Sequence, residues 1–236
     1  MRIEILKSAK EAIGKEFKGK NVVVIDVLRA TTVMVTALQN GAKCIYPFKE
    51  IEDAKRGQSL TQNGLLAGER KGLKIEGFDF GNSPLEFTKD KVEGKEIYMT
   101  TSNGTRAIEN ALGADGLYIA CYLNISAISK KLLEEKKDVI ILCAGTDDEF
   151  SLDDSLCAGI IAKKIGEKSE IEMNDFTLSL KRLAEYAPGV KQVLEGSKHY
   201  SYLKKIGYEE DLEYCVKMDI SEIVPFYING KIKTSS

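Results

Sequence analysis

The sequence has few of the residues on which several common catalytic centres depend. Among its 236 residues only His199 is a histidine, which excludes a zinc site built from several histidines. No cysteine is followed six positions later by arginine, no G-x-x-x-x-G-K-[ST] loop is present, and Asp26-Val27-Leu28 lacks the second aspartate of the D-x-D phosphatases. A lone histidine is more often a surface or packed residue than a catalyst, and a role as proton donor stays open.

Cysteine pairs, long apolar runs and excess charge are also scarce. The five cysteines form no C-x-x-C pair and no charged-then-apolar leader is seen, so we expect a cytoplasmic protein with buried free thiols. No apolar run approaches the roughly 20 residues that span a bilayer, so we expect no membrane insertion. The formal net charge of −2 provides no basic field for nucleic acid, and any anion site must be local. The sequence leaves open whether the protein forms a homo-oligomer.

Short apolar runs alternate with helical patterns along most of the chain. The expected strands are Val22–Ile25, Cys44–Tyr46, Leu65–Ala67, Ile97–Met99, Leu117–Cys121 and Val139–Cys143. The expected helices are Thr32–Gln39, Ile51–Thr61, Arg106–Leu112, Ile125–Glu134 and Leu152–Ile165. This alternation predicts an α/β protein with a layered, largely parallel sheet and crossover helices. The order of the strands is not readable from the pattern.

The pattern changes after about Gly166. In the remaining segment, two helical stretches are expected at Asn174–Tyr186 and Ser197–Ile206, with a break between them at Pro188-Gly189. Residues 223–232 have the pattern of a strand that enters an Asn-Gly turn. We therefore predict an α/β core over residues 1–166, with a C-terminal helical and strand portion, 167–236, packed on it as a subdomain or cap.

A first polar cluster follows the apolar run Val22–Ile25. In parallel α/β sheets, ligands bind beyond the carboxyl ends of strands, where helix N-termini offer N–H groups to anions. Asp26 would hold a metal or act as a nucleophile, and Arg29 would bind phosphate through two parallel hydrogen bonds. Thr31 and Thr32 would contact phosphate. The alternative is a structural Asp–Arg pair with one of the threonines as a helix cap.

A second cluster, Gly68-Glu69-Arg70-Lys71-Gly72, continues through residues 77–84. Its glycines would let the backbone approach a ligand, and Glu69 beside Arg70 repeats the pairing of an acid with an arginine. Glycine, asparagine and proline also form ordinary turns, so the alternative is a surface loop.

The third cluster, Thr100 to Arg106, follows an expected strand and precedes an expected helix. Its hydroxyls, glycine and arginine suit a phosphate site at a helix N-terminus, formed by Ser102, Asn103, Gly104, Thr105 and Arg106. The alternative is a hairpin at Asn103-Gly104, but the following residues have a helical pattern.

The fourth cluster contains five acids within residues 147–154. Oxygen ligands of this kind suit a hard divalent cation. Ser151 with Asp154 resembles a helix cap with acids in the first turn. Asp147 and Glu149 do not fit that explanation and are the preferred metal ligands here.

Taken together, the clusters resemble the 2-phosphosulfolactate phosphatase family. The resemblance lies in several long motifs in the same order: Asp26-Val27-Leu28-Arg29-Ala30-Thr31-Thr32, Gly68-Glu69-Arg70, Gly81-Asn82-Ser83-Pro84, Thr101-Ser102-Asn103-Gly104-Thr105-Arg106 and Cys143-Ala144-Gly145-Thr146. It extends to His199 and Val224-Pro225. The chain departs from the family pattern at Val33, where a third threonine is expected, and so lacks one hydroxyl there.

The resemblance implies Mg²⁺-dependent hydrolysis of 2-phospho-3-sulfolactate to sulfolactate and phosphate, a step associated with coenzyme M synthesis. Such a substrate carries a charge of roughly −3.5 to −4, which three arginines and a metal would balance: Arg29, Arg70 and Arg106. Our hypothesis for the metal is Mg²⁺ held by some of Asp26, Glu69, Asp147 and Glu149. The alternatives are a phosphatase of another small anionic phosphoester, a phosphometabolite-binding regulator, or a phosphotransferase, for which no nucleotide site is evident.

Overall fold

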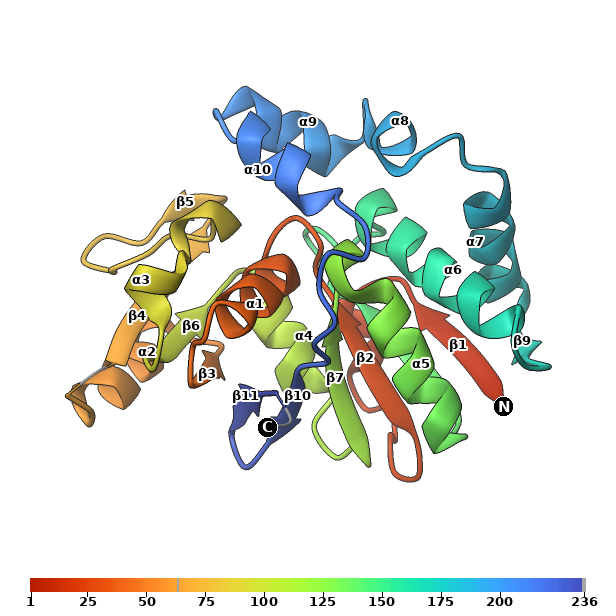
Figure 1. The fold of residues 1–236 in the computed structure, drawn as a ribbon, viewed down its shortest axis with the longest axis horizontal. Coiled ribbons are helices and arrows are strands. Elements are labelled where there is room, and N and C mark those ends of the chain that lie inside the picture. The colour runs from red at the N-terminus through yellow and green to blue at the C-terminus, as the bar shows by residue number, and fades with distance from the viewer. Residues whose placement is uncertain (63, 235–236) are drawn as a thin grey trace.

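The computed structural model describes residues 1–62 and 64–234, and an eleven-stranded sheet organises them (Figure 1). The strands are β1 (Arg2–Leu6), β2 (Asn21–Ile25), β3 (Cys44–Phe48), β4 (Gly64–Arg70), β5 (Leu73–Lys74), β6 (Glu96–Thr100), β7 (Gly116–Ala120), β8 (Val139–Cys143), β9 (Glu172–Met173), β10 (Phe226–Ile228) and β11 (Lys231–Lys233). Their order is β5-β4-β6-β3-β11-β10-β7-β2-β8-β1-β9. Two runs of parallel strands, β4-β6-β3 and β7-β2-β8-β1-β9, confirm the predicted α/β class with a largely parallel sheet.

The helices cover both faces of this sheet. They are α1 (Ala30–Gln39), α2 (Ile51–Ser59), α3 (Lys89–Val92), α4 (Gly104–Asn110), α5 (Ile125–Glu135), α6 (Leu152–Gly166), α7 (Asp175–Tyr186), α8 (Val190–Leu194), α9 (Lys198–Lys205) and α10 (Glu209–Cys215), with 3-10 turns at Ala9–Ala12, Pro84–Glu86 and Tyr122–Asn124. The predicted helices are therefore confirmed, with ends that differ by one or two residues.

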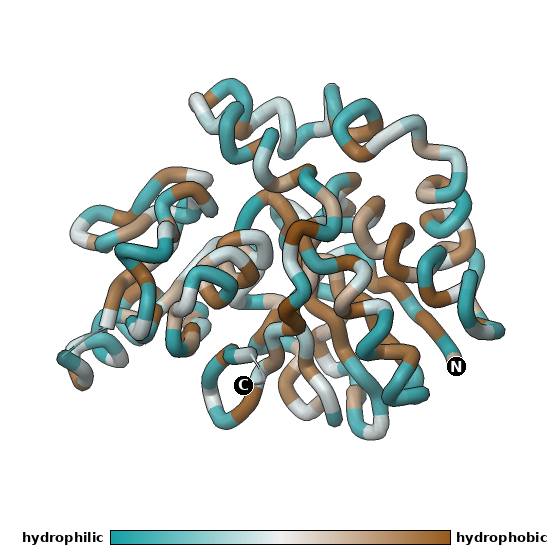
Figure 2. The backbone as a smooth tube through the Cα atoms, in the orientation of Figure 1, coloured by the Kyte–Doolittle hydropathy of each residue, from teal (hydrophilic) through white to brown (hydrophobic). Residues whose placement is uncertain are grey.

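Strand β2 shows why the apolar runs are continuous rather than alternating. Val23 and Ile25 pack into the core on the side of α5 and α6, whereas Val22 and Val24 pack into the core on the side of α1 and α4. A strand covered on both faces buries every side chain, and the whole of β2 is inaccessible to solvent. Figure 2 shows the resulting hydrophobic centre between more hydrophilic outer helices.

The C-terminal segment contributes to the sheet as well as to its cover. Strands β10 and β11 form an antiparallel hairpin that lies between β3 and β7, and both residues of its predicted turn, Asn229 and Gly230, have positive φ as a tight hairpin requires. Helices α9 and α10 lie over the loops that begin α1 (Figure 1). The division at residue 166 stays a prediction, since the end of the chain completes the middle of the sheet.

Two other expectations concern thiols and the membrane. All five cysteines are buried and unpaired, which confirms the prediction of buried free thiols. Within residues 1–62 and 64–234, no helix has both the length and the apolar character that crossing a bilayer requires.

Candidate active site

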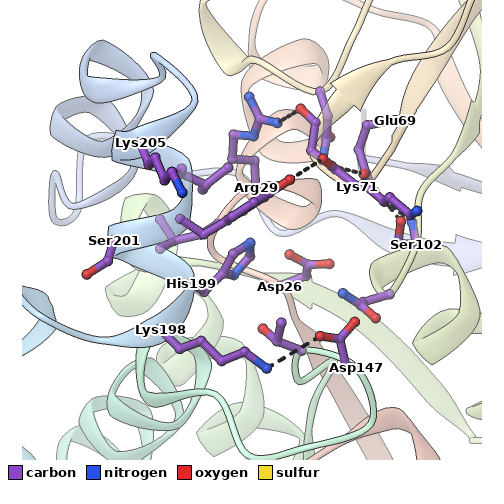
Figure 3. Close-up of a pocket in the computed structure, with 17 residues that line it drawn as sticks. Asp26, Arg29, Glu69, Lys71, Ser102, Asp147, Lys198, His199, Ser201 and Lys205 are labelled. Carbon is purple, nitrogen blue, oxygen red and sulfur yellow. Dashed lines mark hydrogen bonds and ion pairs between the residues drawn. The ribbon is translucent and has the colours of Figure 1, made fainter.

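A cavity of about 610 Å³ opens at the carboxyl ends of the central strands, beneath α9 (Figure 3). Its polar lining comes from loops that follow four strands and from the covering helix. The loop after β2 contributes Asp26 and Arg29, the end of β4 Glu69, the loop after β6 Ser102 and Asn103, the loop after β8 Thr146 and Asp147, and α9 Lys198 and His199. Each of the four predicted clusters thus contributes some of its residues to one cavity, and the second contributes Glu69, Lys71, Gly72 and Asn82.

Asp26 is the first residue after β2 and is almost fully buried. Its backbone N–H donates to Thr31 Oγ1 at 3.0 Å, and the Thr31 N–H donates to the Asp26 carbonyl at 2.9 Å. The Thr32 hydroxyl donates to the Val27 carbonyl at 2.8 Å. Neither threonine lines the cavity, so in this structure their hydroxyls fix the loop that carries Asp26. Thr31 and Thr32 lie inside α1 rather than at its N-cap, which is Arg29.

The helix that follows β6 approaches Asp26 closely because its first residue is a glycine. A Cβ atom on Gly104 would lie 2.6 Å from Ala30 Cβ and 2.8 Å from Asp26 Oδ2. Such separations are far below van der Waals contact, so any side chain here would displace the Asp26 carboxylate. Glycine at position 104 is therefore a steric requirement of the site.

Arg29 lies in the cavity wall with its guanidinium already engaged. Nη1 donates to Asp211 Oδ2 at 2.7 Å, Nη2 donates to the Gly72 carbonyl at 2.7 Å, and the group lies 3.9 Å from the centre of the Tyr208 ring. Its side chain is 1% exposed. In this structure Arg29 joins the Asp26 loop to the covering segment.

Glu69 also has a positioning role in the structure. Its Oε1 accepts the Ser102 N–H and its Oε2 accepts the Gly72 N–H, both at 2.7 Å. Through these bonds one buried carboxylate fixes the loop after β6 and the turn between β4 and β5.

His199, which lines the cavity with Asp26, pairs with the buried Asp153, and neither is among the predicted site residues. His199 Nδ1 lies 3.4 Å from Asp153 Oδ2, and the imidazole ring faces the Asp26 carboxylate (Figure 3). Asp153 is buried and also accepts a hydrogen bond from the Ser151 hydroxyl. Because Asp153 occupies Nδ1, the other ring nitrogen, Nε2, is available to a bound ligand.

The next residue, Asp154, is buried and bonds to the backbone of two loops of the site. Its two oxygens accept the Val27 N–H at 2.9 Å and the Gly145 N–H at 3.1 Å. Burial, together with the charges of Asp153 and Asp26, raises the pKa of Asp154 well above its ordinary value. Through its two hydrogen bonds, the Asp154 carboxyl group links the loops that follow β2 and β8.

Burial and neighbouring charges set the protonation of the floor. Burial raises the pKa of Asp26 from 3.8 to about 6, against the opposing effect of His199. Burial alone would lower the pKa of His199, but the hydrogen bond and charge of Asp153 outweigh it and raise that pKa above 6.5. For Asp153 the same pairing overcomes burial and lowers the pKa. The floor thus holds an imidazolium between two carboxyl groups at slightly acidic pH.

Two predicted arginines lie outside the cavity lining. Arg70 donates to the Lys49 carbonyl at 3.0 Å and to Thr100 Oγ1 at 2.9 Å, and so braces neighbouring strands. Arg106 Nη2 lies 2.7 Å from Asp148 Oδ1 and 3.4 Å from Asn103 Oδ1. Their predicted phosphate contacts would need a movement of these side chains.

The remaining predicted residues divide between the cavity and its surroundings. Ser102 and Asn103 line the cavity, whereas Thr105 is buried and its hydroxyl donates to the Thr101 carbonyl at 3.1 Å. Asp147 lines the cavity but is exposed, 3.5 Å from Lys198 Nζ, and the exposed Glu149 is not part of the lining.

The pattern around Ser151 explains why Asp153 and Asp154 were not among the predicted ligands. Ser151 is the N-cap residue of α6 as expected, but its side chain makes no capping bond and pairs with Asp153 instead. The predicted side-chain cap is therefore wrong, because both aspartates turn inward to the site. A signal was present: the chain's only histidine and a pair of acids at the start of a long apolar helix.

The four predicted metal ligands are not gathered into a cage. Within the part of the chain that the structure describes, no three His, Cys, Asp or Glu side chains are placed to hold an ion together. Magnesium, however, is commonly held by one or two carboxylates and completed by substrate phosphate and water. Among the described residues, Asn82 Oδ1 and Thr146 Oγ1 are buried without a hydrogen-bond partner and belong to residues that line the cavity with Asp26. These hard oxygen donors fit such a partly substrate-held ion.

Comparison with known proteins agrees with the motifs. The sequence profile of the family described as 2-phosphosulpholactate phosphatase matches residues 7–230. A "Probable 2-phosphosulfolactate phosphatase" of Clostridium perfringens (strain SM101) is 43% identical over 238 residues, covering 99% of this chain and 96% of that protein. Proteins of the same description in Clostridium tetani and Caldanaerobacter subterraneus subsp. tengcongensis are 45% and 42% identical, covering 99% and 94% of this chain and 100% and 93% of theirs. The chain therefore belongs to the 2-phosphosulpholactate phosphatase family.

Proposed function

We propose that this protein is a phosphoric monoester hydrolase that converts 2-phospho-3-sulfolactate and water into 3-sulfolactate and phosphate. Family membership supports the reaction and substrate. The structural observation that carries the proposal is a single cavity whose buried floor combines Asp26 with His199 and whose lining holds four cationic side chains, Arg29, Lys71, Lys198 and Lys205. Such a lining suits a small substrate with several negative charges.

The residues of the floor have distinct roles in the proposed reaction. Asp26 would hold Mg²⁺, with Asn82 and Thr146 as neighbouring oxygen donors, and a bound magnesium ion would supply positive charge to the phosphoryl oxygens. His199, kept protonated by Asp153, would give the proton on Nε2 to the ester oxygen as its bond to phosphorus breaks. Glu69 would keep the loop after β6 in place through the Ser102 N–H.

A second use of Asp26, as a nucleophile, is separable by experiment. Attack by Asp26 on phosphorus would give a phospho-aspartate, which rapid quench traps during turnover. Direct attack by water leaves no such species. The proposal of Asp26 as a metal ligand predicts that none is trapped.

The experiment that tests the function is phosphate release from 2-phosphosulfolactate, with Mg²⁺ and with excess chelator. We expect rapid release with Mg²⁺ and a loss of at least about 100-fold with chelator, because the metal contributes several kcal/mol to charge stabilisation. Absence of release with Mg²⁺ contradicts the proposal. Binding of the substrate without turnover would favour a regulatory protein, and faster release from another phosphoester would favour a different substrate.

We also propose a cytoplasmic location. The support is the set of five unpaired thiols, which persist in the reducing cytoplasm.

A further inference from the structure

Charge in the cavity is arranged by depth. The reactive groups lie deep, with Asp26 8% exposed and the His199 side chain 19% exposed. The three lysines that line the cavity are all exposed: Lys71, Lys198 and Lys205. In Figure 3 these lysines surround the pair formed by Asp26 and His199 rather than lying beside it. The cavity therefore has a reactive floor and a cationic rim.

Two of the rim lysines have no carboxylate partner among the residues that the structure describes. Lys198 Nζ lies 3.5 Å from Asp147, whereas neither Lys71 nor Lys205 forms an ion pair with any residue that the structure describes. Arg29, the fourth cation, is already bonded to Asp211 and Gly72. At the rim, the positive charge that no described carboxylate already faces therefore comes from Lys71 and Lys205.

The two lysines are also held on connected elements. Lys71 lies in the turn between β4 and β5 with a φ of 53°, and its carbonyl accepts the Tyr202 hydroxyl at 2.9 Å. Tyr202 lies on α9, the helix that ends at Lys205. The neighbouring Gly72 N–H is fixed by Glu69. This linkage holds the backbone of both lysines at the cavity mouth. Binding of an anion there therefore requires little further ordering of the backbone.

We propose that Lys71 and Lys205 bind the non-reacting anionic groups of the substrate and so select phosphoesters that carry further negative charge. The inference rests on the proposed function, which places the phosphoryl group at the floor. A small phosphoester held there directs its remaining substituents towards the rim. Carboxylate and sulfonate groups find cations at that position, whereas a neutral substituent does not.

Calorimetric titration with two probes tests the two levels of the cavity separately. The probe 3-sulfolactate has a carboxylate and a sulfonate but no phosphoryl group, and inorganic phosphate has only the phosphoryl part. We expect Lys71→Gln and Lys205→Gln each to weaken 3-sulfolactate binding about fivefold, the size of one partly exposed ion pair. Binding of inorganic phosphate in the presence of Mg²⁺ should change by less than about twofold.

The matched control is Lys204→Gln. Lys204 precedes Lys205 on α9 and is exposed, but it is not part of the cavity lining. It removes the same charge from the same helix turn, so it reports the general electrostatic effect alone. Equal effects of Lys204→Gln and Lys205→Gln would overturn the proposal, as would absence of 3-sulfolactate binding by the wild-type protein or an equal loss for both probes.

Kinetics distinguish this inference from the proposed function. The lysine variants should raise KM for 2-phosphosulfolactate about fivefold and leave kcat within about twofold, because the lysines bind without touching the reacting bond. A fall in kcat with unchanged KM would overturn the role of the lysines. Failure of the wild-type protein to release phosphate would instead contradict the proposed function, and the calorimetric result would still decide the role of the rim.

Discussion

At the residue scale, the site depends on buried carboxyl groups whose pKa values are shifted in opposite directions. Asp26 has its pKa raised to about 6, whereas Asp153 has its pKa lowered by the adjacent imidazole. His199 lies between them with a raised pKa. Groups whose environments separate their pKa values are typical of acid–base catalysis.

The pH dependence of kcat/KM follows from these shifts. Asp26 must be ionised to hold a cation, so activity should fall as pH drops through the pKa of Asp26, near or below pH 6 because a bound cation favours the carboxylate. His199 must be protonated to donate, so activity should also fall as pH rises through its raised pKa. A bell-shaped profile is therefore expected from initial rates between pH 4 and 9.

The variant Asp153→Asn assigns the alkaline limb of this profile. Removing the charge that raises the pKa of His199 should move the alkaline limb to lower pH. Asp90→Asn, on the exposed first turn of α3, is the control and should leave both limbs in place. An alkaline limb that does not move in Asp153→Asn would show that another group carries it.

Gly104→Ala tests the close approach of α4 to Asp26. The added Cβ would lie 2.8 Å from Asp26 Oδ2, so we expect a loss of stability of about 1–3 kcal/mol and a fall in kcat/KM of about 100-fold. Gly166→Ala is the control, because its Cβ would meet only the ends of the Ile171 and Lys181 side chains, at 3.0 and 3.2 Å. Chemical denaturation and steady-state rates measure the two effects. Wild-type rates in Gly104→Ala would contradict the steric account.

Sequence reasoning identified residue types at this scale more reliably than their contacts. Asp26 was predictable because a polar residue after a fully apolar strand has few structural explanations. The contact between Arg29 and Asp211 was not predictable, because 182 residues separate the two in the chain. Similarly, acids are common in the first turn of a helix, so the pair of acids that includes Asp153 is a signal only when it is considered together with the distant His199.

At the element scale, a buried ion pair attaches α10 to the loop before α1. The Arg29 and Asp211 side chains are 1% and 4% exposed, and Asp211 Oδ1 also accepts the Ser83 hydroxyl at 2.6 Å. Loss of one partner from a buried pair leaves an uncompensated charge. The cover over the site therefore depends on this contact.

Asp211→Asn should accordingly destabilise the protein by about 3 kcal/mol, because it leaves the buried Arg29 charge uncompensated. It should also raise KM, because α10 contacts α9, which carries His199 and two of the rim lysines. Glu213→Gln, on α10 like Asp211, is the control. It removes an ion pair with Lys191 whose side chains are 57% and 44% exposed, so it should destabilise the protein far less. Thermal unfolding and substrate titration provide the comparison. Equal destabilisation by the two variants would contradict the importance of the buried pair.

The predictable elements were those with a strong local pattern. The six apolar runs were identified as strands because burial on both faces removes polar residues from them. Strand β1 was not among them, since its apolar residues alternate with the exposed Arg2 and the partly buried Glu4. The Asn-Gly turn was predictable from its residues alone, but the place of its hairpin in the sheet was not.

At the scale of the whole molecule, the end of the chain closes the centre of the sheet. The hairpin of β10 and β11 lies between β3 and β7, and without it both strands would have an unpaired edge. The two halves of the parallel sheet are thus connected by residues 226–233. No pattern in the sequence specifies such a long-range pairing.

A protein ending at residue 166 should therefore not fold independently. It would lack the central hairpin and α7, which packs extensively on α6. We expect a loss of cooperative thermal unfolding and of near-ultraviolet circular dichroism. A cooperatively folded 1–166 fragment would instead support the predicted division of the chain into two parts.

The most direct test of the account is phosphate release from 2-phosphosulfolactate with Mg²⁺ by the wild-type protein, Asp26→Asn and Asp90→Asn, each shown to be folded. The account predicts turnover by the wild type and Asp90→Asn, and a kcat/KM at least about 1,000-fold lower in Asp26→Asn, since the amide removes the charge that holds the cation. Turnover by Asp26→Asn close to that of the wild type would contradict the central place of Asp26.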